Sequence, residues 1–428
     1  MSIEELYKIY LQYPSVQTDT RKLKPGDIFF ALKGPNFNGN SFAQQAVDAG
    51  AVCAVIDEKD FEIPAKTFLV QDVLAALQAL AHHHRKQFHI PFLAITGSNG
   101  KTTTKELIHA VLSSTYKVYT TEGNLNNHIG VPLTILKIKS DADIAVIEMG
   151  ANHQHEIESY CKIAEPTHGI ITNCGKAHLE GFGSVEGVKK AKGELYDHLR
   201  KVQGTAFVMW DYDYLRDMSN GIADIIKYGT KEADITGNVL PSSTFLNVKI
   251  NHPETEIHTK LVGDYNLPNV LAAVAVGREM KIGMEKIKQS VEDYTPSNSR
   301  SQLLEKNSNK FILDAYNANP SSMKLAIENF AGIDAPGKIM MLGAMAEMGE
   351  ESMAEHQNLV ELIKKYDWQN VVLVGKQFEP FKDQFTVFEN AATAAEWFVK
   401  QNFENSYFLV KGSRSSQMEK ILVAGGIV

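Results

Sequence analysis

The segment 96–104 has the composition and spacing of a phosphate-binding loop. It reads Thr-Gly-Ser-Asn-Gly-Lys-Thr-Thr-Thr, follows an apolar run that predicts a buried strand, and opens a helical stretch. The glycines let backbone N–H groups turn toward an anion, the helix dipole favours negative charge, and Lys101 adds a full positive charge. The hydroxyl of Thr102 is placed to ligate a magnesium ion on the phosphates. We therefore predict nucleotide binding by Gly97, Ser98, Asn99, Gly100, Lys101, Thr102 and Thr103.

Glu148 is a candidate magnesium ligand further along the chain. It falls at the end of the apolar run 144–147, which predicts another strand. Ligands of open α/β sheets bind at the carboxyl ends of the strands, where a carboxylate can hold the same magnesium ion as Thr102. The alternative is a solvated residue at the end of a strand. A phosphate loop on the same sheet favours the metal role.

A loop histidine and a row of helical lysines follow the next predicted strand, 169–172. His178 lies on the loop at the same sheet edge, where a lone histidine is usually a surface residue. The helix behind it carries Lys189, Lys190 and Lys192. Lysines on a helix usually form a solvated face, and their spacing alone does not single out one of them.

Asn266 and Asn269 lie where another helix is predicted to begin. Their spacing puts both amides on one face of that helix. Amides pair well with the donor and acceptor edge of adenine, but asparagine is also a common helix cap. The sequence supports the two interpretations equally.

The last third of the chain places polar residues after two predicted strands. The first group spans 314–320 and the second, Lys-Gly-Ser-Arg, spans 411–414. Both are expected to be strand-end loops facing a cleft between segments. Lys411 and Arg414 suit a substrate that bears a carboxylate.

Composition limits the class of protein. The chain has 428 residues, 44% of them hydrophobic and 22% charged, with a net charge of −8. These values fit a globular protein of two or three domains, and the acidic balance argues against nucleic acid as a partner. The three cysteines have no metal-like spacing, which fits a reducing cytosol. We find no signal peptide or membrane-spanning run, so we expect a cytoplasmic protein without a membrane partner.

The pattern of elements divides the chain into three segments, 1–88, 89–298 and 299–428. The first holds strand-like runs and a helix that ends at the run His82-His83-His84-Arg85, which we interpret as a solvated helix end. The second alternates strands and helices as a parallel sheet with helices on both faces does, and the third predicts another open α/β sheet. Within the second segment, 230–260 predicts short alternating strands, and 293–299 is a candidate linker and hinge.

Five of these motifs together resemble the Mur ligase family. They are the segments 96–103, 148–151, 178–180, 316–320 and 411–414. The resemblance covers all three segments, and it is most specific at 316–320 and 411–414. It implies an α/β fold of three domains: an N-terminal domain that binds a UDP-linked substrate, a central parallel-sheet P-loop ATPase domain and a C-terminal Rossmann-like domain.

The same resemblance implies an activity and roles for individual residues. The activity is ATP- and Mg²⁺-dependent joining of D-Ala-D-Ala to UDP-N-acetylmuramoyl-tripeptide through an acyl phosphate, which forms the pentapeptide precursor of peptidoglycan. Lys192 would be carbamylated and would hold a second magnesium ion with His178 and Glu148, and these three join Lys101 as the implied catalytic residues. The implied ATP contacts are Asn266, Asn269, Arg300 and Asp314. The implied substrate contacts are Thr20, Arg21, Asn126, Asn127, Tyr316, Asn317, Asn319, Lys411 and Arg414.

Two other functions compete with this interpretation. One is a sister ligase that adds a different amino acid, or glutamate to a folate, against which the sequence at 316–320 speaks. The other is a non-catalytic or regulatory ATPase. The identity of the third peptide residue, lysine or diaminopimelate, stays open at this point. We expect a monomer.

Overall fold

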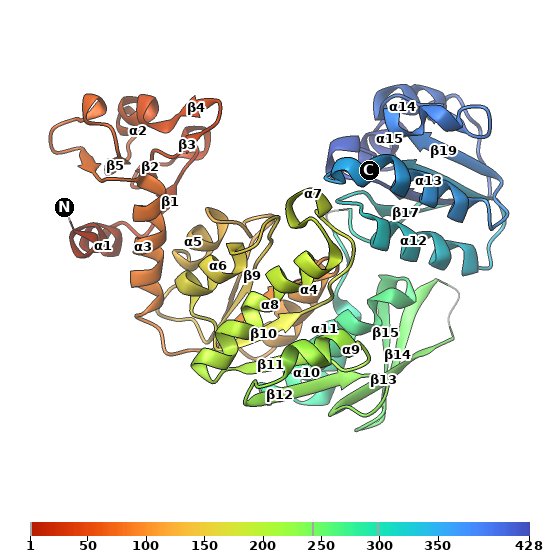
Figure 1. The fold of residues 1–428 in the computed structure, drawn as a ribbon, viewed down its shortest axis with the longest axis horizontal. Helices are drawn as coiled ribbons and strands as arrows, with labels where there is room; N and C mark the ends of the chain where they lie inside the picture. Colours follow the sequence, from red (N-terminus) through yellow and green to blue (C-terminus); the bar gives the residue numbers. More distant parts are fainter. Residues whose placement is uncertain (1, 242–243, 298) are drawn as a thin grey trace.

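The chain folds around three α/β sheets that follow one another along the molecule (Figure 1). The computed structural model describes residues 2–241, 244–297 and 299–428. The α/β class, the central parallel sheet and the second open sheet at the C-terminal end are as predicted from the sequence. Residue 298 of the predicted linker lies outside the described residues.

The N-terminal sheet has four parallel strands in the order β1-β2-β5-β6. Its two central strands, β2 and β5, fall where the sequence predicts strands, and both are fully buried. The strands of this part are β1 (Val16–Gln17), β2 (Ile28–Phe30), the hairpin β3 (Lys33–Gly34) and β4 (Phe37–Asn38), β5 (Cys53–Ile56) and β6 (Thr67–Leu69). The α-helices are α1 (Ile3–Gln12), α2 (Ala43–Asp48) and α3 (Val73–Arg85). The short 3₁₀ helices, labelled η, are η1 (Thr20–Lys22), η2 (Gly39–Phe42) and η3 (Lys59–Phe61).

The prediction of a solvated helix end at 82–85 is wrong for His84 and Arg85, which are buried, whereas His82 and His83 are partly exposed. His84 Nε2 lies 2.8 Å from the carbonyl oxygen of Ile138 in the central part. Arg85 donates from Nε to the carbonyl of Ala164 at 2.7 Å and from Nη2 to that of Glu165 at 2.8 Å. Both side chains belong to residues that are only 6% exposed. The reason is that α3 packs against helices of the central sheet, which a reading of the local sequence does not include.

The central sheet has nine strands in the order β15-β14-β13-β12-β11-β10-β7-β9-β8. The strands from β8 to β13 pair in parallel, whereas β13, β14 and β15 pair antiparallel, which confirms the short alternating strands predicted at 230–260. Strands β7 and β9 are buried along their whole length, as parallel strands covered on both faces usually are. The bounds are β7 (Phe92–Thr96), β8 (Val118–Thr120), β9 (Ile144–Glu148), β10 (His168–Ile171), β11 (Thr205–Met209), β12 (Asp224–Gly229), β13 (Ile235–Leu240), β14 (Phe245–Ile250) and β15 (Thr255–Val262).

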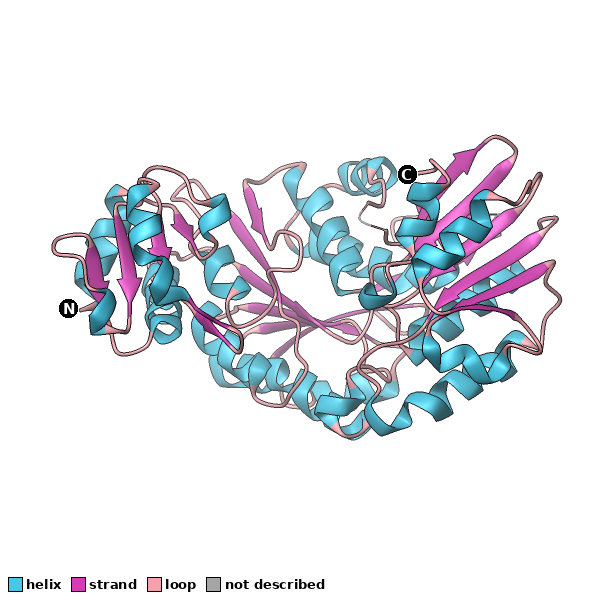
Figure 2. Cartoon of the chain, turned by 90° about the horizontal axis from the view of Figure 1, so that it is seen from above, coloured by secondary structure: helices cyan, strands magenta, loops and turns pink. Residues whose placement is uncertain are grey.

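Helices cover the central sheet in two groups (Figure 2). One group packs α4 against α10 and α11, and the other packs α6 against α3 and α8. A single hydrophobic core runs from the N-terminal sheet through α3 into these layers. The helices are α4 (Lys101–Ser113), α5 (Gly130–Ile135), α6 (Glu156–Ala164), α7 (Leu179–Phe182), α8 (Val185–Val202), α9 (Asp213–Ser219), η4 (Asp264–Asn266), α10 (Leu267–Glu279) and α11 (Met284–Asp293).

The C-terminal sheet has six strands in the order β16-β17-β21-β18-β19-β20. All pairs are parallel except β16 with β17 at one edge. The strands are β16 (Gln302–Lys306), β17 (Asn309–Asp314), β18 (Lys338–Gly343), β19 (Asn370–Val374), β20 (Thr386–Phe388) and β21 (Tyr407–Lys411). The helices are α12 (Pro320–Gly332), η5 (Gly349–Glu351), α13 (Ser352–Ile363), η6 (Lys376–Phe381), α14 (Ala391–Val399), η7 (Arg414–Ser416) and α15 (Glu419–Ala424).

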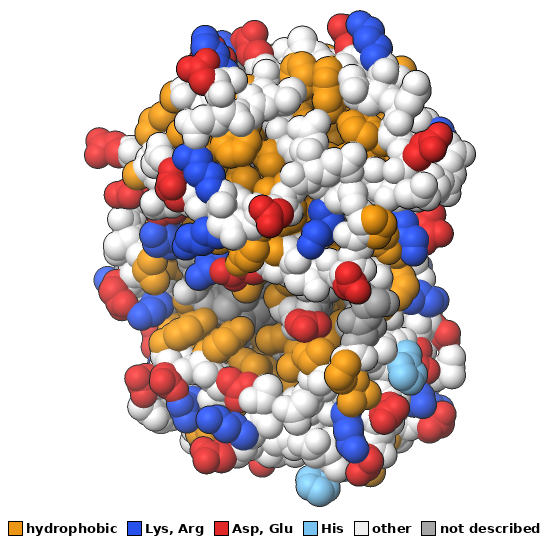
Figure 3. All heavy atoms as spheres, turned by 90° about the vertical axis from the view of Figure 1, so that its right-hand side faces the viewer, with side chains coloured by type: hydrophobic (Ala, Val, Ile, Leu, Met, Phe, Trp, Pro, Cys, Tyr) orange, Lys and Arg blue, Asp and Glu red, His pale blue; other side chains and the backbone are white. Residues whose placement is uncertain are grey.

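The face that contains the C-terminal part together with β14 and β15 has mixed charge (Figure 1 and Figure 3). Figure 3 shows basic and acidic side chains interspersed among hydrophobic ones over this face.

Of the helices in the described residues, none combines the length and apolar character that crossing a bilayer requires. Cys53, Cys161 and Cys174 are all buried and unpaired.

Candidate active site

A cavity of about 670 Å³ lies between the central and C-terminal sheets. It is bordered by the segments that follow β7, β9 and β10 on one side, and by the segment after β17 and the last residue of β21 on the other. This is the strand edge where ligands of α/β sheets bind. The predicted site residues that line it are Ser98, Asn99, Gly100, Lys101, Thr102, Thr103, Asn126, Asn127, Glu148, His178, Asn266, Asn269, Arg300, Asp314, Tyr316, Asn317, Asn319 and Lys411. Those that do not line it are Thr20, Arg21, Gly97, Lys192 and Arg414.

The phosphate loop has the predicted strand, turn and helix geometry. Gly97 has φ +143°, and a Cβ there would lie 2.0 Å from the Thr172 hydroxyl, so only glycine fits. Gly100 has φ +80° and precedes α4, whose first residue is Lys101. Lys101 Nζ donates to the carbonyl of Gly97 at 2.6 Å, and burial lowers the pKa of its ammonium group. The loop thus combines a helix N-terminus with a lysine folded over it, an arrangement suited to phosphate.

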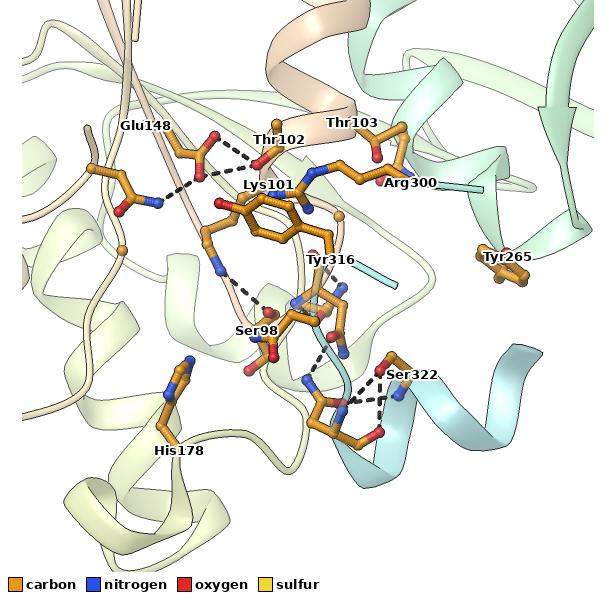
Figure 4. A pocket seen from close by; sticks show the side chains of 18 of the residues that line it. Ser98, Lys101, Thr102, Thr103, Glu148, His178, Tyr265, Arg300, Tyr316 and Ser322 are labelled. Atoms are coloured by element: carbon orange, nitrogen blue, oxygen red, sulfur yellow. Dashed lines mark hydrogen bonds between the residues drawn. The ribbon is translucent and has the colours of Figure 1, made fainter. Parts of the chain in front are cut away.

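Thr102 and Glu148 meet inside the cavity (Figure 4). The Thr102 hydroxyl lies 2.9 Å and 3.1 Å from the two carboxylate oxygens of Glu148, and Asn126 Nδ2 donates to the same carboxylate at 2.8 Å. Glu148 is 1% exposed, which rules out the solvated strand-end alternative. A hydroxyl and a carboxylate held together are hard oxygen donors of the kind that magnesium prefers, so the residues present fit this ion.

His178 pairs with the C-terminal part of the molecule. Its Nδ1 lies 2.6 Å from Glu347 Oε2, and this contact lowers the pKa of the Glu347 carboxyl. Among the described residues, no three or more His, Cys, Asp and Glu side chains form a group that could hold a metal ion. The joint magnesium site of His178, Glu148 and Lys192 therefore stays a prediction.

Lys192 is buried, so the solvated-helix alternative does not hold for it. The residue is 1% exposed, its Nζ lies 3.3 Å from the carbonyl oxygen of Ala151, and it lies 5.1 Å from the centre of the Phe182 ring. Burial is the main cause that lowers the pKa of its amine to about 7, and the positive charge of Lys101 adds to it. The neutral form of this amine is therefore easier to reach than that of an exposed lysine.

Asn266 and Asn269 pair with each other at the start of α10. Asn269 Nδ2 donates to Asn266 Oδ1 at 2.8 Å, and the Thr104 hydroxyl donates to Asn269 Oδ1 at 3.0 Å. Asn266 stands at the N-cap position, but its side chain makes no capping hydrogen bond. Of the two interpretations left open by the sequence, helix capping thus loses its support, and both amides border the cavity.

The C-terminal side of the cavity carries cationic groups. Lys411, which is 2% exposed, forms an ion pair with Asp314. The guanidinium of Arg300 stacks 3.5 Å above the centre of the Tyr316 ring, as Figure 4 shows. Arg414 lies 5.9 Å from the same ring with its side chain 70% exposed, outside the cavity lining.

Three of the predicted substrate asparagines also stabilise the backbone. Asn127 Oδ1 accepts from the N–H groups of Ile129 and Gly130 at the start of α5. Asn317 Oδ1 accepts from the next backbone N–H. Asn319 caps α12, and its Nδ2 donates to Asn99 Oδ1 of the phosphate loop at 2.7 Å. The last contact joins the two sides of the cavity directly.

Thr20 and Arg21 lie in the N-terminal part, away from the cavity lining. The Arg21 guanidinium pairs with the carboxylate of Asp19 through two hydrogen bonds of 2.8 Å. The Arg21 side chain is 87% exposed. Their assignment to the UDP end of a substrate stays a prediction.

Sequence reasoning missed several residues that border the cavity. Asn152 and Asn173 follow β9 and β10, so the strand-end rule that singled out Glu148 would also have found them. For the others no local pattern gives a signal, because they enter the site through helix starts and long loops. The missed residues include Asn152, Glu156, Tyr160, Asn173, Tyr212, Asp264, Ser301 and Ser322.

Family profiles cover most of the chain in three parts. Residues 12–87 match the profile described as Mur ligase family, catalytic domain, and residues 95–277 match the Mur ligase middle domain. Residues 299–414 match the Mur ligase, glutamate ligase domain.

Relatives and solved structures agree with these profiles. The UDP-N-acetylmuramoyl-tripeptide–D-alanyl-D-alanine ligases of Escherichia coli and Bacillus subtilis are 35% and 33% identical, over 98% and 95% of this chain and 95% and 92% of theirs. MurF from Acinetobacter baumannii superposes with a TM-score of 0.87 at 31% identity, covering 96% of this chain and 93% of its own. MurF from Thermotoga maritima, solved in complex with ADP, gives 0.86 at 26% identity, with 97% of each chain covered. The chain therefore belongs to the Mur ligase family, and within that family its sequence and fold are MurF-like.

Proposed function

We propose that this chain joins D-Ala-D-Ala to UDP-N-acetylmuramoyl-tripeptide, the two substrates that the names of its relatives give, and that it converts ATP to ADP in doing so. The observation that carries the proposal is the single cavity that brings the phosphate loop of the central sheet within reach of Lys411 and Asp314 of the C-terminal sheet. A carboxylate becomes reactive toward an amine only after activation, and phosphorylation by ATP to an acyl phosphate supplies it. The protein then has to position groups and neutralise charge.

The phosphate loop and the amides of α10 form the proposed ATP site. Lys101 and the loop N–H groups neutralise the phosphates, and Asn266 with Asn269 faces the adenine. Arg300 and Asp314 contact the nucleotide from the C-terminal side. Thr102 and Glu148 would hold Mg²⁺, which supplies charge neutralisation on the phosphate oxygens when bound.

The remaining predicted residues form the proposed substrate sites. We assign Lys411, Arg414 and the segment 316–319 to the carboxylate and peptide groups, and Asn126 and Asn127 to the tripeptide end. Thr20 and Arg21 are assigned to the UDP end, which lies far from the chemistry. The proposed domains are residues 1–88 for the UDP-linked substrate, 89–298 for ATP and 299–428 for the ligase reaction.

The decisive experiment measures which substrates phosphate release requires. We expect the purified chain to release phosphate from ATP only when UDP-N-acetylmuramoyl-tripeptide and D-Ala-D-Ala are both present, with one pentapeptide formed per phosphate. Mg²⁺ chelation should stop the reaction. Hydrolysis that is indifferent to both substrates would instead support a regulatory ATPase. Tripeptides that carry lysine or diaminopimelate, tested side by side, identify the preferred third residue.

Lys192 is expected to carry a carbamate. Its buried amine has a pKa lowered to about 7, so the neutral form that adds carbon dioxide is available and increases as the pH rises through 7. The resulting anion offers oxygen donors to a hard cation. Protein equilibrated with ¹³C-bicarbonate should show a carbamate carbon resonance, stronger at pH 8 than at pH 6, which Lys192→Ala abolishes. Lys190→Ala, on the same helix, is the matched control and should keep the signal. An active preparation without this resonance would contradict the assignment.

The proposed setting of the enzyme is a monomer in the cytoplasm. The three buried, unpaired cysteines are compatible with a reducing compartment, where ATP is also available.

A further inference from the structure

The loop between β10 and α7, residues 172–178, touches the phosphate loop at its first half. Asn173 Oδ1 accepts from the backbone N–H of Asn99 at 3.0 Å, and Asn173 Nδ2 donates to the carbonyl of Asn99 at 3.1 Å. The Thr172 hydroxyl donates to the same carbonyl at 2.6 Å. The backbone of Asn99 is therefore fixed by this loop.

The second half of the loop touches the C-terminal part. The backbone N–H of Lys176 donates to the Ser321 hydroxyl on α12 at 3.1 Å, and Lys176 Nζ lies 2.7 Å from Glu355 Oε1 on α13. A Cβ on Gly175 would lie 2.8 Å from the Ser321 hydroxyl oxygen, so the backbone itself approaches α12. Neither Lys176 nor Glu355 is among the residues assigned to ATP or substrate.

The Lys176–Glu355 ion pair has an asymmetric environment. The Glu355 side chain is only 7% exposed, whereas the Lys176 side chain is 49% exposed. Loss of the lysine leaves a carboxylate largely buried without its cation, which costs more free energy than loss of an exposed ion pair. A contact of this kind opposes separation of the two parts that it joins.

We propose that Lys176 and Glu355 are positioning residues for the ligation reaction, which hold the C-terminal part over the phosphate loop through the loop 172–178. The inference rests on the proposed function. It deepens that function by naming an ion pair that, beside the Asn319–Asn99 hydrogen bond, holds the C-terminal groups Asp314 and Lys411 near Lys101. Because the loop binds Asn99 and α13 at once, the docking of the C-terminal part and the position of the phosphate loop are coupled.

A double-mutant cycle on kcat tests the coupling. Lys176→Met is expected to lower kcat about tenfold, and Glu355→Gln about threefold, because the glutamine keeps the shape but not the charge. The double variant should be no slower than Lys176→Met alone, since the shared contact is already lost. The KM for ATP should change less than kcat, because Lys101 and Thr102 of the phosphate loop are retained. Lys137→Met is the matched control: its lysine is 50% exposed and pairs with Glu122 within the central part.

Hydrogen exchange at the loop gives a readout that does not depend on activity. In Lys176→Met the amides of residues 175–178 should exchange faster than in the wild type, whereas Lys137→Met should leave them unchanged. Glu355→Gln gives the same readout if Lys176→Met loses its fold. Additive effects on kcat, or unchanged exchange in these variants, would overturn the positioning role. A wild-type chain with no ligation activity would reject the proposed function. Hydrogen exchange at residues 175–178 would still report on the contact between Lys176 and Glu355.

Discussion

Lys101→Ala is expected to lower turnover by about a thousandfold or more, because it removes the one lysine of the phosphate loop. Among the described residues, the Lys101 ammonium donates hydrogen bonds to carbonyl oxygens of its own loop, Gly97 at 2.6 Å and Ser98 at 3.2 Å. Its loss removes charge from the site without breaking contacts between elements, so we expect the fold to be retained. Ligation assays measure the first effect, and thermal unfolding followed by circular dichroism measures the second.

Lys105 provides the contrast on the same helix. It is 1% exposed, its Nζ donates to the carbonyl of Thr121, and it pairs with Glu106 at 2.8 Å. Lys105→Met should therefore lower the unfolding temperature, and it should not change how the site neutralises the ATP phosphates. If purified Lys101→Ala kept near-normal ATP-dependent ligation, the assignment of the central site would be wrong.

Features that depend on a short stretch of sequence were predicted well. The phosphate loop needs a strand, two glycines and a helix start within one continuous segment. Its geometry can therefore be predicted from the local sequence. The buried strands β7, β9, β10 and β11 also follow from apolar runs, and the alternating pattern at 230–260 indicates the antiparallel strands. Glu148 could be placed for the same reason, since it ends a strand next to that loop.

Features that depend on packing between distant segments could not be predicted. Lys192 has the sequence context of a solvated helix, and its burial arises because its face of α8 turns toward the sheet and α6. Asn319 looks like a simple helix cap, and only the approach of the C-terminal part gives its amide a second partner at Asn99. Glu347 and Glu355 carry no local signal at all, because their partners lie more than a hundred residues away.

The predicted solvent exposure of His84 and Arg85 at the end of α3 was wrong for the same physical reason. A polar run at the end of an apolar helix usually meets solvent. Here α3 is the element that joins the N-terminal sheet to the central one, so its last turn lies inside a core that both share. Tyr10 contacts His84 Nε2 from α1, and the Arg85 guanidinium lies 3.8 Å from the centre of the Phe92 ring on β7.

Arg85→Met should lower the free energy of unfolding by about 3 kcal/mol, since it removes several charge-assisted hydrogen bonds from a buried site. Methionine keeps much of the apolar stem of arginine. The destabilisation therefore comes from the carbonyl oxygens of Ala164 and Glu165, which lose the hydrogen bonds that the guanidinium donates. Denaturant unfolding monitored by tryptophan fluorescence measures the change. Lys86→Met, at the next position and exposed, is the control and should change stability by less than about 0.5 kcal/mol.

The outcome also decides how the N-terminal part can be studied. If Arg85 holds the two sheets in one cooperative unit, removal of residues 1–88 exposes the core around β7 and unfolds the central sheet, so a truncated protein cannot report on UDP binding. Arg21→Ala then becomes the proper probe, because its side chain is exposed and its ion-pair partner among the described residues is the neighbouring Asp19. It should raise the KM for the UDP-linked substrate and leave stability unchanged. Equal stability of Arg85→Met and the wild type would instead show that Arg85 does not hold the two parts together.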